Sequence, residues 1–247
     1  MILLLDAGNS RLKWAMLRNS VFEHGGAFAL AKSSVGELAS AAWSDLERPD
    51  CVMVANVAGE PFRRAFNSWA KRRWNLIPAY VQATAEAFSV RNAYREPERL
   101  GVDRWLALLG ARELFEGALC VIDCGTALTI DVLAQDNRHL GGLIVPGLSL
   151  MQEALAQRAE GIRQQIAEAS HEQVTLLGTD TGSAVAGGTL YAEVAVIDRV
   201  IMDLGSELGQ PLRCVLTGGD AARLAPLLGI RSELEPELVL RGLARIA

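Results

Sequence analysis

The chain has 247 residues, with 24 Lys and Arg against 29 Asp and Glu, and half of its residues are hydrophobic. This composition excludes a disordered chain, and the length suits two domains of ordinary size. The net charge of −5 makes a nucleic-acid partner unlikely, because such proteins usually carry a basic face. The four cysteines form no C-x-x-C pair, and no apolar run is long enough to span a membrane. We therefore expect a cytoplasmic protein that does not enter the membrane.

The first half of the chain predicts a hairpin followed by alternating helices and strands. Apolar residues flank the turn Gly8-Asn9-Ser10, as in a strand, turn and strand. Ser34 and Glu37 form a capping-box pattern at a helix start. The predicted strands are 2–5, 12–17 and 51–57, and the predicted helices are 35–47, 60–74 and 103–115, with a loop over 89–102.

The second half opens with another apolar block, "LCVIDCG", and continues with predicted strands and helices. Small residues fill a long helical pattern that begins at Thr181. A Gly-Gly turn follows the last clear strand, and the segment 161–178 has no assignable pattern. Beyond the opening block, the predicted strands are 127–134, 140–145 and 212–217, and the predicted helices are 148–160, 181–208, one after Asp220, and 237–247.

The two halves resemble each other around one short motif. "LLLDAGNSRLKWAML" aligns with "CVIDCGTALTIDVLA", which places Asp6 on Asp123 and Gly8 on Gly125, 117 residues apart. Glycine lets backbone N–H groups approach an anion, and aspartate suits Mg²⁺ directly or through water. Lys13 would neutralise phosphate oxygens. For one segment alone, an ordinary hairpin turn is the alternative.

A third glycine turn, Gly218-Gly219, follows a strand and could seat adenosine. Its alternative is a plain strand-to-helix loop with Asp220 at the helix start. No G-x-x-x-x-G-K-[ST] or strand-linked G-x-G-x-x-G pattern occurs, so the P-loop and Rossmann interpretations lack support. The three histidines lack H-E-x-x-H spacing, and we assign no metal site to them.

The motifs Asp6-x-Gly8-x-Ser10-x-x-Lys13, Asp123-x-Gly125-Thr126 and Leu216-Thr217-Gly218-Gly219 resemble those of the acetate/sugar kinase, chaperone and actin superfamily. Within it, "DAGNSRLKW", "YREPERLGVDRW", "DCGTALTIDVL", "GGLIVPGLSLM" and "LTGGDAA" resemble the type III pantothenate kinase family. The resemblance implies an α/β fold of two similar ribonuclease-H-like, actin-like lobes, with mixed sheets flanked by helices and a nucleotide cleft between them. The expected lobes are 1–117 and 118–247.

The resemblance also implies ATP-dependent phosphorylation of pantothenate to 4'-phosphopantothenate, the first step of coenzyme A biosynthesis, by a homodimer that uses Mg²⁺ and a monovalent cation, K⁺ or NH₄⁺. The implied base is Asp103, and Asp123 is the implied ligand of the monovalent cation. Mg²⁺ is expected at Asp6, directly or through water. The implied pantothenate contacts are Tyr94, Gly101, Val102, Asp103, Arg104 and Thr181. The implied ATP contacts are Asp6, Ala7, Gly8, Asn9, Ser10, Arg11, Leu12, Lys13 and Thr126.

Other interpretations stay open at several positions. Asp103 and Thr181 could simply cap helices, and Tyr94 could cover apolar surface in a loop. Glu96 and Asp180 stand where many members of the family have asparagine. Two alternative functions are a kinase for a sugar, acetate or related acceptor, and a non-enzymatic regulator that docks through the basic stretch "RRAFNSWAKRR". A basic helix face usually meets only water.

Overall fold

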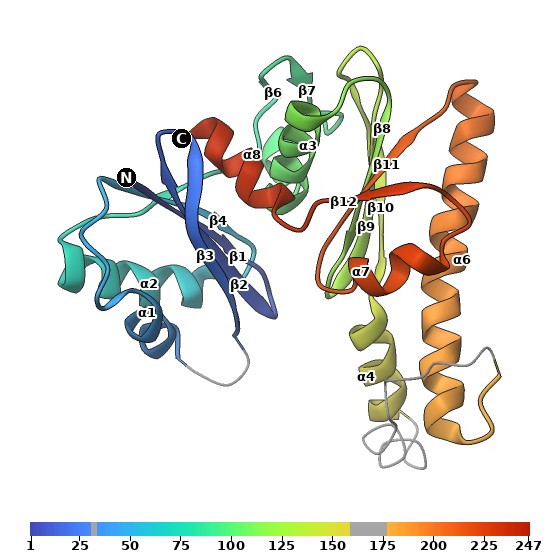
Figure 1. Ribbon diagram of the computed structural model, residues 1–247, viewed down its shortest axis with the longest axis horizontal. Coiled ribbons are helices and arrows are strands. Elements are labelled where there is room, and N and C mark those ends of the chain that lie inside the picture. Colours follow the sequence, from blue (N-terminus) through green and yellow to red (C-terminus); the bar gives the residue numbers. More distant parts are fainter. Residues whose placement is uncertain (31–33, 159–176) are drawn as a thin grey trace. The chain divides into compact units, whose positions relative to one another are not determined.

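The structure, a computed structural model, describes residues 1–30, 34–158 and 177–247 (Figure 1). The chain divides into two compact units. The first contains Met1–Glu116, Asn137–His139 and Glu237–Ala247, and the second contains Gly117–Asp136 and Leu140–Pro236. The main division lies beside the boundary expected after residue 117, whereas the C-terminal segment belongs to the first unit.

The first unit is built on a five-stranded mixed sheet. The central strand β1 (Ile2–Ala7) pairs antiparallel with β2 and parallel with β4. The turn of the predicted hairpin is therefore real, and a third strand that the sequence analysis missed extends it to the sheet edge. The order is β3 (Val21–Ala29), β2 (Arg11–Arg18), β1, β4 (Cys51–Asn56) and β5 (Ala79–Tyr80).

Two amphipathic helices cover one face of this sheet, as Figure 1 shows. The helix α1 (Val35–Trp43) begins with the predicted capping box, because Glu37 N donates to Ser34 Oγ at 3.3 Å and Ser34 N donates to the Glu37 carboxylate at 2.9 Å. The next helix, α2 (Gly59–Trp74), buries a stripe of aromatic side chains. Alternate residues of β1 point into the same core, which contains Leu3, Leu5, Trp43, Phe62, Phe66, Trp69 and Trp74.

Two further helices of the first unit pack against each other although they are far apart in sequence. The helices are α3 (Val102–Leu114) and α8 (Leu238–Ile246). A Cβ on Gly242 would strike the Leu106 carbonyl, and a Cβ on Gly110 would strike the Leu238 carbonyl. The two backbones are therefore in direct contact, and α8 also contacts β1, β2 and β4. This packing places residues 237–247 in the first unit rather than in the expected C-terminal lobe.

The segment between α2 and α3 is mostly irregular, and its second half falls in the loop predicted over 89–102. It contains a small hairpin, β6 (Glu86–Ala87) and β7 (Val90–Arg91), whose turn residues Phe88 and Ser89 have positive φ angles of 49° and 65°. A short 3-10 helix, η1 (Pro97–Arg99), precedes α3.

The second unit repeats the sheet order of the first. Its central strand β8 (Leu119–Cys124) pairs antiparallel with β9 and parallel with β11, as β1 does with β2 and β4. The sequence repeat is thus present as a repeated topology, and Asp6 and Asp123 occupy corresponding places near the ends of the two central strands. The order is β10 (His139–Pro146), β9 (Ala127–Leu133), β8, β11 (Arg213–Thr217) and β12 (Ser232–Leu234).

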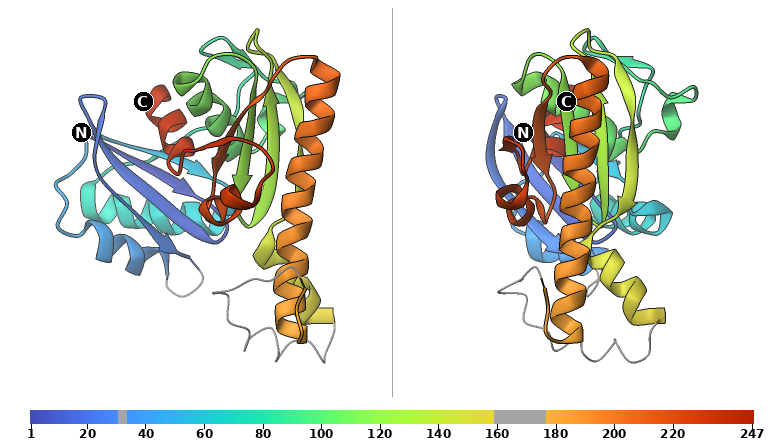
Figure 2. Two further views of the ribbon diagram at one scale, coloured as in Figure 1. Left: turned by 45° about the vertical axis from the view of Figure 1, so that its right-hand side comes forward. Right: turned by 90° about the vertical axis from the view of Figure 1, so that its right-hand side faces the viewer.

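Helices cover one face of the second sheet, and the longest of them runs along the strands (Figure 2). The core between them is aliphatic and contains, among others, Ile122, Ile130, Leu190, Ile197 and Leu216. The helices predicted over 148–160 and 181–208 are confirmed as far as the structure describes them. The segment 161–178, which had no assignable pattern, lies mostly outside the described residues. The helical elements are α4 (Leu148–Arg158), α6 (Thr181–Leu208), α7 (Ala221–Leu224) and the 3-10 helix η2 (Ala225–Leu227).

Candidate functional site

The β1–β2 turn places a carboxylate and an ammonium group directly opposite each other. Asp6 and Lys13 are partners in the antiparallel register, so their side chains lie on the same face of the sheet. Gly8 N donates to the Arg11 carbonyl at 3.0 Å, and a Cβ on Gly8 would come within 3.1 Å of that carbonyl. The close turn therefore favours glycine, as expected for a loop whose backbone approaches a ligand.

The predicted nucleotide contacts in this turn differ in what they can present. The side chains of Ala7 and Leu12 are fully buried in the core, so only their backbone atoms could meet a ligand. Asn9, Ser10 and Arg11 are exposed. The turn thus combines buried anchors, exposed polar side chains and the opposed charges of Asp6 and Lys13.

The β8–β9 turn has a different construction. Asp123 lies between Thr129 of β9 and Thr217 of β11. The glycine turn after β11 packs against it, because a Cβ on Gly218 would lie 2.5 Å from Asp123 Oδ1 and would strike the Cys124 carbonyl. Gly218 also has a φ of +97°, a conformation that favours glycine.

Further backbone hydrogen bonds hold this second site together. Asp220 N donates to the Cys124 carbonyl at 3.0 Å, and Gly147 N donates to the Thr126 carbonyl at 3.1 Å. The β8–β9 turn, the start of α4 and the "TGGD" turn therefore form one packed group. The carboxylate of Asp123 and the backbone carbonyls around it are oxygen donors, which fit a hard cation.

Asp103 lies in the first turn of α3, but it is not the N-cap. Gly101 is the N-cap, with φ −51° and ψ 130°, and makes no side-chain cap. Asp103 Oδ1 accepts a hydrogen bond from Arg104 N at 2.8 Å, and a Cβ on Gly101 would lie 2.6 Å from the same oxygen. The spacing Gly-x-Asp is thus explained sterically, because only glycine leaves room for this carboxylate orientation.

Arg104 and Tyr94 meet beside Asp103. The Arg104 side chain is buried, and its Nη1 donates to the Tyr94 hydroxyl at 3.0 Å. The guanidinium carbon lies 5.9 Å from the centre of the Tyr94 ring. Val102, the first residue of α3, is buried. The structure therefore brings together five of the six predicted pantothenate contacts: Tyr94, Gly101, Val102, Asp103 and Arg104.

Thr181, the sixth predicted contact, is in the second unit and begins α6. It does not cap this helix, because the N-cap is Asp180, whose Oδ1 accepts from Ser183 N at 2.9 Å. The hydrogen bond from the Ser183 hydroxyl, followed by the one from Ser183 N, lowers the pKa of the Asp180 carboxyl. Aspartate is a strong N-cap residue.

The buried polar residues include His139 and Glu193, which were not among the predicted site residues. His139 is 3% exposed and stacks on Tyr94, and no spacing in the sequence connects these residues. Glu193 is 2% exposed within the apolar stretch of α6, where a single acidic residue is a usable sequence signal. Burial, followed by the nearby Asp220 carboxylate, raises the pKa of Glu193 to about 7.

The basic stretch of α2 is partly engaged within the first unit. Arg73 donates to the Ser44 carbonyl at 2.6 Å, and Arg63 lies 4.6 Å above the centre of the Tyr80 ring. These contacts give the stretch a local structural role. No described helix has the length and apolar character to cross a membrane, and the described residues hold no group of three or more His, Cys, Asp or Glu suited to a metal ion.

Comparison with known proteins gives one consistent family. The profile of the type III pantothenate kinase family matches residues 2–203. A protein of Nitrosococcus oceani with that name is 43% identical, and the alignment covers 100% of this chain and 94% of the relative. A protein of Azoarcus sp. with the same name is 37% identical, with 100% and 90% covered.

Solved structures resemble this chain at low sequence identity and show its fold. A conserved Baf family transcriptional activator from Campylobacter jejuni has a TM-score of 0.61 at 20% identity, with 99% of this chain and 96% of that chain covered. The activator of 2-hydroxyisocaproyl-CoA dehydratase from Clostridium difficile, solved with bound ADPNP, has a TM-score of 0.54 at 13% identity, with 100% and 93% covered. The expected actin-like α/β fold is confirmed.

Proposed function

Because the chain belongs to the type III pantothenate kinase family, we propose that it transfers the γ-phosphoryl group of ATP to the primary hydroxyl of pantothenate. The product, 4'-phosphopantothenate, is the first intermediate on the way to coenzyme A. The observation that carries this proposal is the family match over residues 2–203 together with relatives that align along the entire chain.

The two strand-end turns are our candidates for holding ATP. We assign the β1–β2 turn, residues 6–13, and Thr126 to the nucleotide, with Lys13 offsetting phosphate charge. Asp6, as an oxygen donor opposite that lysine, suits Mg²⁺ directly or through water. Mg²⁺ held there would offset the negative charge that develops on the phosphate oxygens.

Asp103 is our candidate for the catalytic base. Phosphoryl transfer depends mainly on positioning and charge stabilisation, so a fixed carboxylate near the acceptor hydroxyl is the group required. The hydrogen bond from Arg104 N and the space left by Gly101 fix the Asp103 carboxylate. We propose that it orients the pantothenate hydroxyl and accepts its proton as the new P–O bond forms.

The acid end of pantothenate requires a cation. Arg104 provides a guanidinium that Tyr94 orients through its hydroxyl. A planar guanidinium matches a carboxylate in a two-point hydrogen bond. We therefore assign Arg104 and Tyr94 to the substrate carboxylate end, and retain Gly101, Val102 and Thr181 as further proposed contacts.

We assign the monovalent cation, K⁺ or NH₄⁺, to Asp123. Support comes from the packed group around it, in which the Gly218 turn leaves room for Asp123 Oδ1 and for the Cys124 carbonyl. Replacing Asp123 with alanine should abolish the stimulation of ADP release by KCl. The rate of ADP release in NaCl should be the same in this variant as in the unmodified protein. A variant that keeps full K⁺ stimulation would contradict this assignment.

We also propose a homodimer and a cytoplasmic location. The edge strand β10 exposes Leu143 and Ile144, which are 48% and 63% accessible, and such apolar edges are commonly covered by another chain. Light scattering should give twice the chain mass, and Ile144→Lys should shift it toward the monomer. The free thiols of Cys51, Cys120, Cys124 and Cys214 suit a reducing compartment.

The activity is tested by coupled ADP release with pantothenate, with and without KCl, beside a panel of sugars and acetate. Pantothenate-dependent release and a phosphorylated product of the correct mass are expected. Phosphorylation of a sugar but not of pantothenate would overturn the substrate assignment. No release with any acceptor from the folded protein would overturn the proposed kinase.

A further inference from the structure

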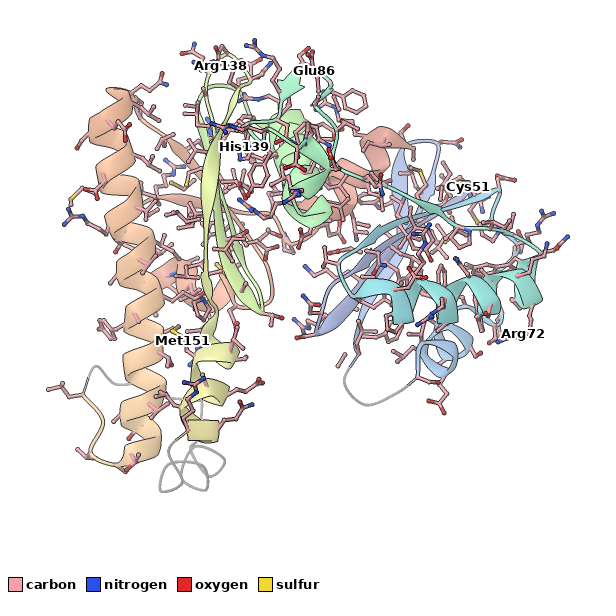
Figure 3. The ribbon with its side chains drawn as sticks, turned by 180° about the vertical axis from the view of Figure 1, so that it is seen from behind. Cys51, Arg72, Glu86, Arg138, His139 and Met151 are labelled. Atoms are coloured by element: carbon pink, nitrogen blue, oxygen red, sulfur yellow. The ribbon has the colours of Figure 1, made fainter. Side chains whose placement is uncertain are left out.

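His139 lies against the candidate substrate residues although it belongs to no predicted motif. It is buried, and as the first residue of β10 it groups with the first unit. Figure 3 labels it together with Arg138, near the β6–β7 hairpin that carries Glu86. It contacts the segment that contains Ala93 and Tyr94.

The backbone before Tyr94 is fixed by its own hydrogen bonds. Arg91 N donates to the Asn137 carbonyl at 3.0 Å, so residues 91 and 137 run side by side. Asn92 Oδ1 accepts from Tyr94 N at 3.0 Å, and Asn92 Nδ2 donates to the Thr84 and Pro97 carbonyls, each at 3.2 Å. With the main chain fixed, the remaining freedom of Tyr94 is that of its side chain.

His139 limits that freedom. The His139 and Tyr94 ring centres are 6.3 Å apart, and the ring planes differ by 13°, within the range of stacked aromatic pairs. Ala93 N donates to His139 Nδ1 at 3.4 Å. Because Nδ1 accepts, the neutral ring carries its proton on Nε2.

On the other side, the Tyr94 hydroxyl accepts from Arg104. The guanidinium must present its planar edge correctly to make a two-point contact with a carboxylate. A shift of the Tyr94 ring would therefore move the orientation of the Arg104 donors. His139, Tyr94 and Arg104 form a chain of contacts that ends at the guanidinium, the cation that an acid substrate needs.

We propose that His139 is a positioning residue for the acid substrate, which holds the Tyr94 ring and thereby sets the direction of the Arg104 guanidinium. The inference rests on the proposed function, since it takes Tyr94 and Arg104 as contacts of pantothenate. It places the effect on substrate binding and leaves the Asp103 carboxylate, on the first turn of α3, unchanged.

The test compares three variants by coupled ADP release, with pantothenate titrated at saturating ATP. His139→Ala should raise the KM for pantothenate about tenfold, since small displacements of positioning groups have large effects. The kcat and the KM for ATP should stay within about twofold. His139→Phe keeps a ring beside Tyr94 and should recover most of the lost affinity. Gln135→Ala, at an exposed position before β10, is the matched control and should leave all constants unchanged.

A folded His139→Ala protein with the original KM for pantothenate would overturn the inference. A lower kcat together with an equal rise in the KM values for pantothenate and ATP would also overturn it. If His139→Ala fails to fold, the comparison can be made between His139→Phe, which keeps a ring beside Tyr94, and His139→Leu, which fills the space without one. Equal KM values for pantothenate in these two variants would overturn the inference. Absence of pantothenate phosphorylation by the unmodified protein is a separate result, which overturns the proposed function and this inference with it.

Discussion

The two strand-end turns share a scaffold and differ in chemistry. Each follows the central strand of a sheet with the same strand order, and each central strand ends near an aspartate. Asp6 faces Lys13 across the antiparallel pair, whereas Asp123 lies between two threonines and against the Gly218 turn. The repeat therefore conserves the place of the carboxylate, while the residues on neighbouring strands decide what it can bind.

The proposed catalytic base, Asp103, lies on α3 and in neither of the two turns. The largest loss of activity is therefore expected from a substitution at Asp103. Asp103→Asn keeps the shape of the side chain and removes its ability to accept a proton. We expect kcat to fall by about 10² to 10⁴, with the KM for ATP nearly unchanged. Rapid mixing with pantothenate and ATP measures this directly. Full turnover by the variant would remove Asp103 from the mechanism.

A smaller loss of activity should follow when the β1–β2 turn loses the lysine opposite its aspartate, as in the β8–β9 turn, where a threonine stands opposite Asp123. Lys13→Met removes the ammonium opposite Asp6, and we expect kcat/KM for ATP to fall by about 10² to 10³. Lys71→Met, at an exposed site in α2, is the control. Equal ATP kinetics in the two variants would show that the charge at Lys13 does not distinguish the turns.

The packing of the second turn can be tested through stability. Gly218→Ala adds a Cβ at a φ of +97° and against Asp123 Oδ1, and should lower the free energy of unfolding by about 1 to 3 kcal/mol. Gly188→Ala, in an exposed part of α6 with nothing within 4 Å of the new Cβ, should raise it by up to about 1 kcal/mol. Urea unfolding of both variants makes the measurement, and equal changes would contradict a packed turn.

A further prediction concerns α6, the helix that carries Glu193. Burial raises the pKa of Glu193 from 4.5 to about 7, so its ionisation opposes folding increasingly from pH 4.5 to 7 and by a constant amount above. Glu193→Gln removes this cost.

Its stability relative to the unmodified protein should therefore be greater at pH 8 than at pH 5 by about 1 to 3 kcal/mol. Glu207→Gln, at an exposed position of the same helix, should show no such difference. A pH-independent effect of Glu193→Gln in urea unfolding would show that the carboxyl titrates normally.

Local patterns in the sequence were sufficient for elements with short-range signals. The capping box of Ser34 and Glu37 and the two strand-end turns were predicted. The strand β3 was missed because "VFEHGGAFA" contains two glycines and no regular alternation of polar and apolar residues. Its strand conformation is stabilised by antiparallel pairing with β2, which the sequence pattern does not show.

Other features depend on contacts that the sequence does not display. Asp103 looked like an N-cap, but the backbone places Gly101 there and turns the carboxylate toward Arg104 N. His139 reaches Tyr94 only because the segments around Asn137 and Arg91 lie side by side. The motif residues could be proposed from the sequence, whereas the contact between His139 and Tyr94 is visible only in the tertiary fold.

The contact between α3 and α8 has a consequence for the order of assembly. Residues 238–246 are synthesised after the whole of the second unit, yet they cover α3 of the first. During synthesis on the ribosome, the surface of α3 around Gly110 therefore stays uncovered until the second unit and then α8 have been made. Biogenesis thus runs in nested order, with the unit begun first being completed after the other.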